Sequence, residues 1–187
     1  LFPSNYGIGT LGIEAYKFAD FLVKAKQKNW QMLPLGPTGY GDSPYQSTSS
    51  YAGNPYMIDL DVLIAEKLLK EDEVKNEFWG NDEKKVDFGN MWTKRYAVLE
   101  KAFKRFKPNA AYETFVNNNK EWLDDFALFM SVKEKFGFGQ WTEWPEDIKL
   151  RQPEAVAKYT KELADKINFH QFPAKSYRPA FHRRDIA

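Results

Sequence analysis

Residues 34–46 form the stretch that most constrains the fold of this chain, because three glycines and three prolines stand among thirteen positions. Proline fixes φ, and glycine allows φ values that other residues avoid, so the loop has a specified shape. Residues 30–33, directly before it, place apolar side chains on both alternating faces. That pattern is typical of a strand in a parallel sheet that is covered on both sides.

The same loop carries many polar and aromatic side chains, namely Tyr40, Asp42, Ser43, Tyr45 and Gln46. A shaped loop at the carboxyl end of a parallel strand is where α/β enzymes place ligand contacts. The loop is therefore a candidate binding site. The alternative is a rigid turn whose side chains only pack.

The sequence WQMLPLGPTGYGDSPYQ at residues 30–46 resembles the opening of the 4-α-glucanotransferases, the amylomaltases or disproportionating enzymes of glycoside hydrolase family 77. The resemblance continues through YGIGTLG at 6–12, AGNPYMIDL at 52–60 and WLDDFALFM at 122–130, and it reaches about Phe172. It covers only the first part of a family member. Because the chain lacks an initiator methionine, we expect it to begin inside a longer product.

The resemblance implies an α/β fold: the start of a (β/α)8 TIM barrel plus a helical insertion subdomain, with the first barrel strand before Leu1. A complete barrel needs about 250 residues, and this chain has 187. We assign residues 1–70 to the barrel and 71–172 to the helical insertion subdomain. Residues 173–187 form an off-pattern tail that we expect to be disordered or loosely packed.

Helix is expected to dominate this piece. Apolar periodicity predicts helices over 13–28, 92–106, 112–136 and from Pro153 to the residue before Pro173. Proline cannot continue a helical ladder, so Pro108 and Pro173 are expected to end the helices before them. Besides the strand at 30–33, we predict a second short strand at 56–60.

Two of these helices carry apolar stripes that predict packing. The stripe of the first helix, expected to face a sheet, consists of Ala15, Phe18, Phe21, Leu22 and Ala25. The stripe of the helix over 92–106 consists of Trp92, Tyr96, Leu99, Phe103 and Phe106. We expect this second stripe to face the helix over 112–136 and to form the core of a helical unit.

Some charged residues have both a structural and a chemical interpretation. Asp59 and Asp61 are either a carboxylate pair or, in the interpretation we favour, Asp61 is a helix N-cap. A cluster of cations is either a solvated helix face, which we favour, or a phosphate site; it consists of Lys101, Lys104, Arg105 and Lys107.

The last third of the chain offers two further candidates. Trp141 and Trp144 lie in a loop at 137–145, where they either stack on sugar or, as such residues do more often, cap a core. His170 is interpreted as a packing residue rather than a ligand or base, because no second histidine or carboxylate stands at a useful offset from it.

Composition excludes several classes of function. Lysine and arginine total 27 against 26 for aspartate and glutamate, so no net field favours nucleic acid or a membrane as partner. There is no cysteine and no apolar run of membrane-spanning length. No metal-ligand cluster, phosphate-binding motif or other cofactor signature is present, so we expect no cofactor. A cytoplasmic location is the default expectation, because the sequence shows no membrane span and its first residues do not read as a signal peptide.

The resemblance implies transfer of α-1,4-glucan segments between maltooligosaccharides by retaining double displacement, with an aspartate nucleophile, a glutamate acid/base and a second aspartate. All three lie on later barrel strands, so no catalytic residue is assigned and this piece alone should be inactive. Tyr45 matches the family tyrosine that packs on the sugar at the cleavage subsite, with Asp42, Ser43 and Gln46 beside it.

Tyr40 matches an aromatic residue at an accessory glucan site, and its role is left open between ligand contact and loop packing. The alternative function is a non-catalytic helical domain that binds glucan or a protein partner through its aromatic residues.

Overall fold

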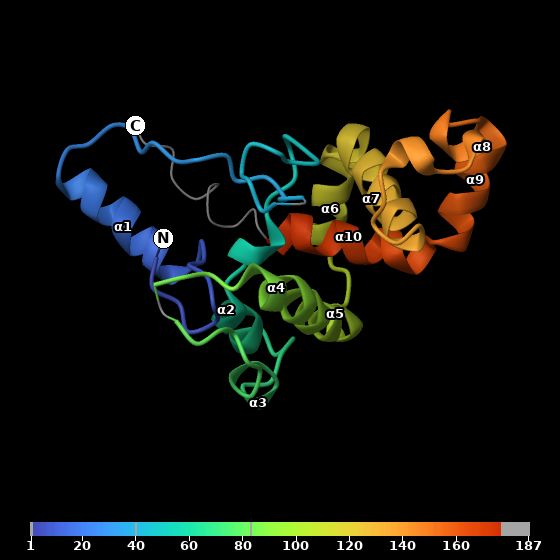
Figure 1. The fold of residues 1–187 in the computed structure, drawn as a ribbon. Helices are drawn as coiled ribbons and strands as arrows, with labels where there is room; N and C mark the ends of the chain where they lie inside the picture. The colour runs from blue at the N-terminus through green and yellow to red at the C-terminus, as the bar shows by residue number, and fades with distance from the viewer. Residues whose placement is uncertain (1, 40, 83, 177–187) are drawn as a thin grey trace. The chain divides into compact units, whose positions relative to one another are not determined.

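The computed structural model describes residues 2–39, 41–82 and 84–176, and helices dominate these residues, as expected (Figure 1). The helical elements are, in chain order, α1 (Ile13–Lys24), the 3-10 helix η1 (Pro55–Met57), α2 (Leu60–Ala65), α3 (Asp72–Lys75), α4 (Phe88–Asn90), the π-helix η2 (Met91–Arg95), α5 (Tyr96–Arg105), α6 (Ala110–Asn118), α7 (Lys120–Lys135), the 3-10 helix η3 (Trp141–Glu143), α8 (Glu146–Lys149), α9 (Pro153–Glu162) and α10 (Ala164–Ser176).

The chain divides into two compact units. The first holds the chain up to Lys107 together with the end of α10 from Pro173, and the second holds Pro108–Phe172. The assignment of 1–70, 71–172 and 173–187 to a barrel, an insertion subdomain and a tail remains a prediction about the whole enzyme. Residues 177–187 lie outside the described residues, so the expectation for most of the tail stays untested.

Neither predicted strand forms within the described residues. Residues 30–33 have no ladder partner there, and the only β-type pairing in the described chain is an isolated antiparallel bridge between Thr38 and Ser47. A strand exists through hydrogen bonds to its neighbours, which an apolar pattern cannot supply. Residues 56–60 instead enter η1 and the first turn of α2, because Asn54 caps η1 and Pro55 presets its first helical φ.

The N-cap of α2 is Asp59, so the assignment of that role to Asp61 was wrong. Asp59 Oδ1 accepts a hydrogen bond from Asp61 N at 3.0 Å, while Asp61 lies in the first turn and accepts from the Tyr6 hydroxyl at 2.5 Å. Asp59 Oδ2 also accepts from Ile13 N at 3.4 Å. This contact requires glycine at position 12, since a Cβ on Gly12 would lie 1.5 Å from the same oxygen.

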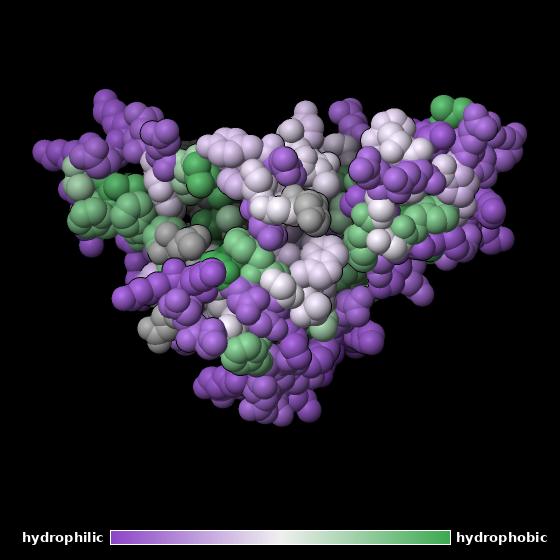
Figure 2. Space-filling view, in the orientation of Figure 1, coloured by the Kyte–Doolittle hydropathy of each residue, from purple (hydrophilic) through white to green (hydrophobic). Residues whose placement is uncertain are grey.

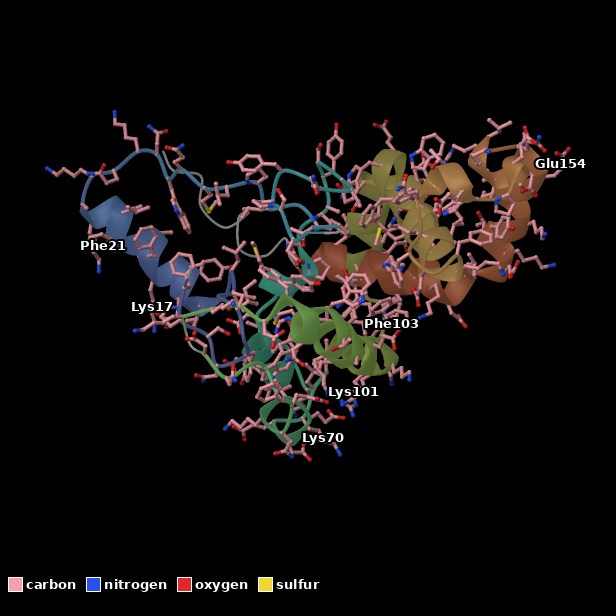
Figure 3. The ribbon with its side chains drawn as sticks, viewed as in Figure 1. Lys17, Phe21, Lys70, Lys101, Phe103 and Glu154 are labelled. Carbon is pink, nitrogen blue, oxygen red and sulfur yellow. The ribbon has the colours of Figure 1, made fainter. Side chains whose placement is uncertain are left out.

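Helix α1 ends at Lys24 rather than Lys28, because Lys26 takes a φ of +56°. Of its predicted stripe only Ala15 is buried, and Phe21, labelled in Figure 3, is 59% exposed. An apolar patch over α1 is visible in the space-filling view (Figure 2). Within this unit, Phe18 packs on Trp30 with ring centroids 5.0 Å apart.

The buried face of η2 and α5 differs from the predicted stripe. Trp92 is exposed, and the buried side chains are Met91, Arg95, Val98, Leu99 and Ala102. The prediction counted apolar residues only, so it passed over the arginine that occupies the centre of this face. Helix α5 does end before Pro108, as expected.

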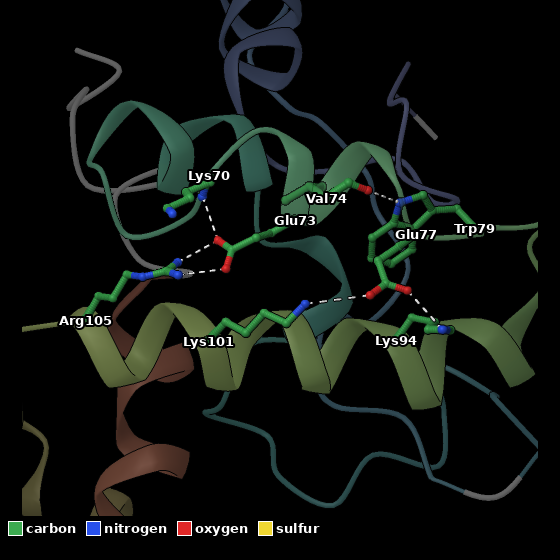
Figure 4. A network of polar contacts seen from close by, with 8 residues as sticks. All are labelled: Lys70, Glu73, Val74, Glu77, Trp79, Lys94, Lys101 and Arg105. Carbon is green, nitrogen blue, oxygen red and sulfur yellow. Dashed lines mark hydrogen bonds and ion pairs between the residues drawn. The ribbon is translucent and has the colours of Figure 1, made fainter.

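Ion pairs join residues 70–79 to one side of η2 and α5 (Figure 4). Glu73 receives two hydrogen bonds from Arg105, at 2.6 and 2.7 Å, and Glu77 lies 2.9 Å from Lys94 and 3.7 Å from Lys101. Two members of the predicted cation cluster are therefore paired with carboxylates, which the sequence interpretation did not include.

The second unit has its core between α7, α8 and α9. The buried cluster consists of Leu128, Val132, Trp144, Ile148, Ala155 and Tyr159. Trp144 thus caps a core, as favoured from the sequence, whereas Trp141 is exposed. Helix α9 begins at Pro153, as predicted.

Two helix boundaries differ from the prediction in this unit. The helix expected over 112–136 is divided into α6 and α7 at Asn119, whose side-chain amide donates to the carbonyl of Phe115 at 2.6 Å. The last helix divides at Leu163, and α10 then runs past Pro173 to Ser176. The expectation that Pro173 ends the helix was wrong: the proline removes one amide donor, and only residues 174–176 follow it.

Candidate functional site

The candidate loop is closed at its base by backbone hydrogen bonds. Asn54 N donates to Leu35 O at 2.8 Å, and Thr48 N donates to Pro37 O at 3.3 Å. Position 36 must be glycine, because a Cβ there would lie 2.2 Å from Ser47 Oγ and clash with it. The loop therefore returns on itself and presents Gly39 and residues 41–46 at its tip.

The tip is built from two short turns. Asp42 N donates to Gly39 O at 3.2 Å, and Gln46 N donates to Ser43 O at 3.1 Å. Asp42 itself has a φ of +55°, which aspartate tolerates better than most residues. Ser43 Oγ accepts from Tyr45 N at 3.3 Å, so the serine shapes the turn that carries the tyrosine.

The candidate side chains differ in exposure. The Tyr45 side chain is 74% exposed, Gln46 is also exposed, and Asp42 and Ser43 are half-buried. Tyr40 lies outside the described residues. Had the Tyr45 ring been sealed in the interior, it would have had no surface to offer a sugar; the structure instead leaves the ring open to solvent.

Asp42 also acts on the segment that follows the loop. The pKa of the Tyr56 hydroxyl is raised above its ordinary value, first by burial and then by Tyr96 and the Asp42 carboxylate. Tyr56 packs edge-on against Tyr96, which in turn packs on Trp92, with ring centroids 6.2 and 5.2 Å apart. Tyr56, Tyr96 and Trp92 therefore form a row of aromatic rings in the first unit.

The described residues offer binding chemistry in this loop rather than bond-breaking chemistry. Asp59 caps α2 and Asp61 accepts from the Tyr6 hydroxyl, so both carboxylates have structural partners. In the described residues no group of three histidine, cysteine or acidic side chains is placed to hold a metal ion. What the loop does present is an exposed phenol ring with polar side chains beside it.

A separate hollow of about 770 Å³ lies in the first unit between residues 2–9 and 79–86. The residues that line it include Gly7, Gly9, Gly80, Lys84 and Lys85. None of the four predicted substrate residues that the structure describes lines it: Asp42, Ser43, Tyr45 and Gln46. The sequence reasoning gave no signal for this hollow.

The comparisons with known proteins agree with the resemblance noted above. The model of the family described as 4-alpha-glucanotransferase matches residues 2–177. The 4-alpha-glucanotransferase of Clostridium butyricum is 47% identical over 172 residues, which are 91% of this chain and 35% of that protein. The 4-alpha-glucanotransferase of Thermus thermophilus is 41% identical over 176 residues, which are 91% of this chain and 34% of that protein.

A solved structure, described as amylomaltase from Streptococcus agalactiae in complex with acarbose, matches with a TM-score of 0.87 at 40% identity, covering 96% of this chain and 37% of that one. This chain therefore spans about a third of the length of the relatives it matches. No helix in the described part of the chain has the length and apolar character that a bilayer span requires. On the family model, the identities and the structural match together, the chain belongs to glycoside hydrolase family 77, the family of the 4-α-glucanotransferases.

Proposed function

We propose that this chain supplies the glucan-contacting first part of a 4-α-glucanotransferase, an enzyme that transfers α-1,4-glucan segments between maltooligosaccharides by retaining double displacement. The observation that carries the proposal is the exposed Tyr45 ring at the tip of a loop whose base is closed by hydrogen bonds. Family membership and the names of the relatives favour this function over a non-catalytic helical domain. A cytoplasmic location belongs to the same proposal.

Tyr45 is proposed to lie against the apolar face of a pyranose. A phenol ring over that face buries apolar area and leaves the sugar hydroxyls free to bond at the edge of the ring. Asp42, Ser43 and Gln46 are proposed to receive those hydroxyls or to hold the ring in place, and Tyr40 to serve an accessory glucan contact. The backbone contact from Tyr45 to Ser43 supports the holding role for the serine.

The bond-breaking groups are proposed to lie on barrel strands beyond this chain. Retaining transfer needs two carboxyl groups about 5 Å apart on either side of the scissile bond. The capping and hydroxyl contacts of Asp59 and Asp61 do not suit them to that task. The chain alone is therefore expected to bind glucan without transferring it.

The first unit is proposed to be the start of a (β/α)8 barrel, with residues 30–33 as a barrel strand and α1 as the helix before it. The exposed apolar side chains Ile13, Phe21 and Leu33 support this, because a barrel would cover them. In such a barrel residues 30–33 would find the ladder partners that the described residues do not supply.

A chimera tests this function. In it, the present chain replaces the matching 172 residues of the Clostridium butyricum relative. We expect the chimera to convert maltotriose to glucose and longer chains, and Tyr45→Ala to lower the affinity for glucan about tenfold, which corresponds to about 1.4 kcal/mol. Tyr51→Ala is the matched control, since Tyr51 is 75% exposed and lies close by in sequence.

A folded chimera without transfer activity would refute the proposed function. Equal behaviour of Tyr45→Ala and Tyr51→Ala would refute the role of Tyr45. Transfer by the purified chain on its own would show that this chain itself carries the bond-breaking groups.

A further inference from the structure

The segment that leaves the candidate loop is deeply buried, and the three-residue 3-10 helix η1 is the only helix that the described chain forms between residues 52 and 58. Ala52, Asn54, Tyr56 and Ile58 are all nearly inaccessible to solvent. Carbonyl groups in such a segment need hydrogen-bond partners, and no sheet supplies them among the described residues. One arginine side chain takes that role for two of them.

Arg95 Nη2 donates to the carbonyl of Tyr56 at 2.7 Å and also to the carbonyl of Ile58. The side chain is wholly buried and comes from the last residue of the π-helix η2, whose wider turn is a form often found at functional sites. The ring of Trp79 lies 5.8 Å from the guanidinium carbon.

The rest of the guanidinium group is poorly satisfied. Its Nε and Nη1 atoms have no hydrogen-bond partner within the described part of the chain, and no ion pair to Arg95 is found there. Burial lowers the pKa of Arg95 to about 9, and the carboxylate of Asp59 opposes this effect only in part. A charge buried without an ion-pair partner lowers stability, so packing alone does not account for an arginine here.

We propose that Arg95 is a positioning residue that fixes the backbone of residues 54–58 and thereby holds the candidate loop in the conformation that presents Tyr45. The glucan-related part of this inference rests on the proposed function. The loop-holding part rests only on the hydrogen bonds described.

A short chain of contacts connects the guanidinium to the loop. The Tyr56 carbonyl accepts from Arg95, and the Tyr56 amide donates to Asn54 Oδ1 at 3.0 Å. The Asn54 amide donates in turn to Leu35 O, the bond that closes the base of the loop. Loss of the guanidinium would leave two buried carbonyls unpaired next to that closing bond.

The test compares Arg95→Met and Arg95→Lys with Leu99→Ala, each in the full chain. Leu99 is fully buried one turn further along in α5, so its truncation lowers stability from the same face while keeping the Arg95 side chain that donates to the two carbonyls. Hydrogen exchange is followed at the Asn54 and Thr48 amides. We expect Arg95→Met to speed their exchange about tenfold more than Leu99→Ala does, with rates corrected for global stability.

Arg95→Lys should recover part of the protection, because its ammonium group can donate to one or both carbonyls. Equal exchange of these amides in Arg95→Met and Leu99→Ala would overturn the inference. Global unfolding of both Arg95 variants, under conditions where Leu99→Ala stays folded, would overturn it as well, because the arginine would then support the whole unit rather than the loop.

A second readout is the affinity for maltoheptaose, measured by titration well below the unfolding temperature. Arg95→Met should weaken binding, Arg95→Lys should restore part of it, and Leu99→Ala should leave it unchanged. A wild-type chain that binds no maltoheptaose would count against the proposed function, while the exchange measurements would still decide the role of Arg95.

Discussion

Glu134 on α7 provides a quantitative test of how the second unit is held together. Its carboxylate lies 2.5 Å from Lys166 Nζ and 3.4 Å from Nε2 of the buried His170, both on α10. The imidazole and then the lysine hold the pKa of Glu134 at about 2, against an ordinary value of 4.5. We therefore expect Glu134→Gln to destabilise this unit.

The expected loss in unfolding free energy follows from the difference between the two pKa values of Glu134, the ordinary value of 4.5 and about 2 in the folded chain. Each pKa unit corresponds to about 1.4 kcal/mol, so the upper bound is about 3 kcal/mol. The Glu134 side chain is 28% exposed and that of Lys166 is 41% exposed. Solvent screening of the pair reduces the expected loss in unfolding free energy to about 1–2 kcal/mol.

The pH dependence has a fixed sign. Because the pKa of Glu134 is lower in the folded state, its contribution is complete above the unfolded value near 4.5 and is lost as the pH falls towards about 2. The wild-type chain should therefore exceed Glu134→Gln in stability at pH 7, and the difference should shrink across that acid range. Urea unfolding followed by tryptophan fluorescence at a series of pH values measures it.

Glu162→Gln is the control, because Glu162 pairs with Lys135 in the same unit but at an exposed position. An exposed pair contributes between about 0 and 1 kcal/mol. The reasoning is refuted if Glu134→Gln costs no more than Glu162→Gln at pH 7, or if its cost does not change between pH 5 and 2.

Two further substitutions test the first unit. Gly36→Ala should lower the free energy of unfolding by about 1–3 kcal/mol, because the new Cβ would lie 2.2 Å from Ser47 Oγ; Gly39→Ala meets only an ordinary contact at 3.6 Å and should cost less in the same urea titration. Asp59→Ala should lower the free energy of unfolding by about 1 kcal/mol, because it removes the cap of α2. Asp61→Ala removes no cap, so it should reduce the helical circular dichroism signal less than Asp59→Ala does.

The sequence predicted the existence of the long helices, but the prediction missed their interruptions. Helix α6 ends at Asn118 and α7 begins at Lys120, so only one residue separates them. The spacing of aromatic and apolar residues across 112–136 continues through this break and does not reveal it. Asn119 is buried and its side chain replaces a backbone contact at that point. Three consecutive asparagines at 117–119 were the available signal, since asparagine is a weak helix former.

The strand prediction failed for a different physical reason. Residues 30–33 have the composition of a doubly covered strand, and Leu33 is nevertheless exposed. An apolar pattern indicates that a segment could pack inside a covered sheet. Whether it forms a strand depends on neighbouring strands that supply hydrogen bonds. The family model matches residues 2–177, which include the candidate loop. That this loop and Tyr45 bind glucan stays a prediction, with which the exposure of Tyr45 agrees.

His170 and Arg95 show what one-dimensional spacing cannot supply. Glu134 comes to His170 from another helix, so no offset along the chain pointed to it. The predicted stripe included apolar residues only, so it left out Arg95 and differed from the face on which Arg95 is buried. In both cases the partner group, a distant carboxylate or a pair of carbonyls, is visible only once the chain is folded.

Three polar side chains supply hydrogen bonds to the backbone of residues 54–61. Asn54 caps η1 and Asp59 caps α2. Arg95 donates hydrogen bonds to the carbonyls of Tyr56 and Ile58, which lie between these two caps in the sequence. Each supplies a hydrogen bond that regular secondary structure would otherwise make. If residues 30–33 join a sheet in the whole enzyme, strand pairing would hold the loop where the chain enters it. The three side chains would hold the segment that leaves it. Replacing Arg95 would then loosen only the segment that leaves the loop.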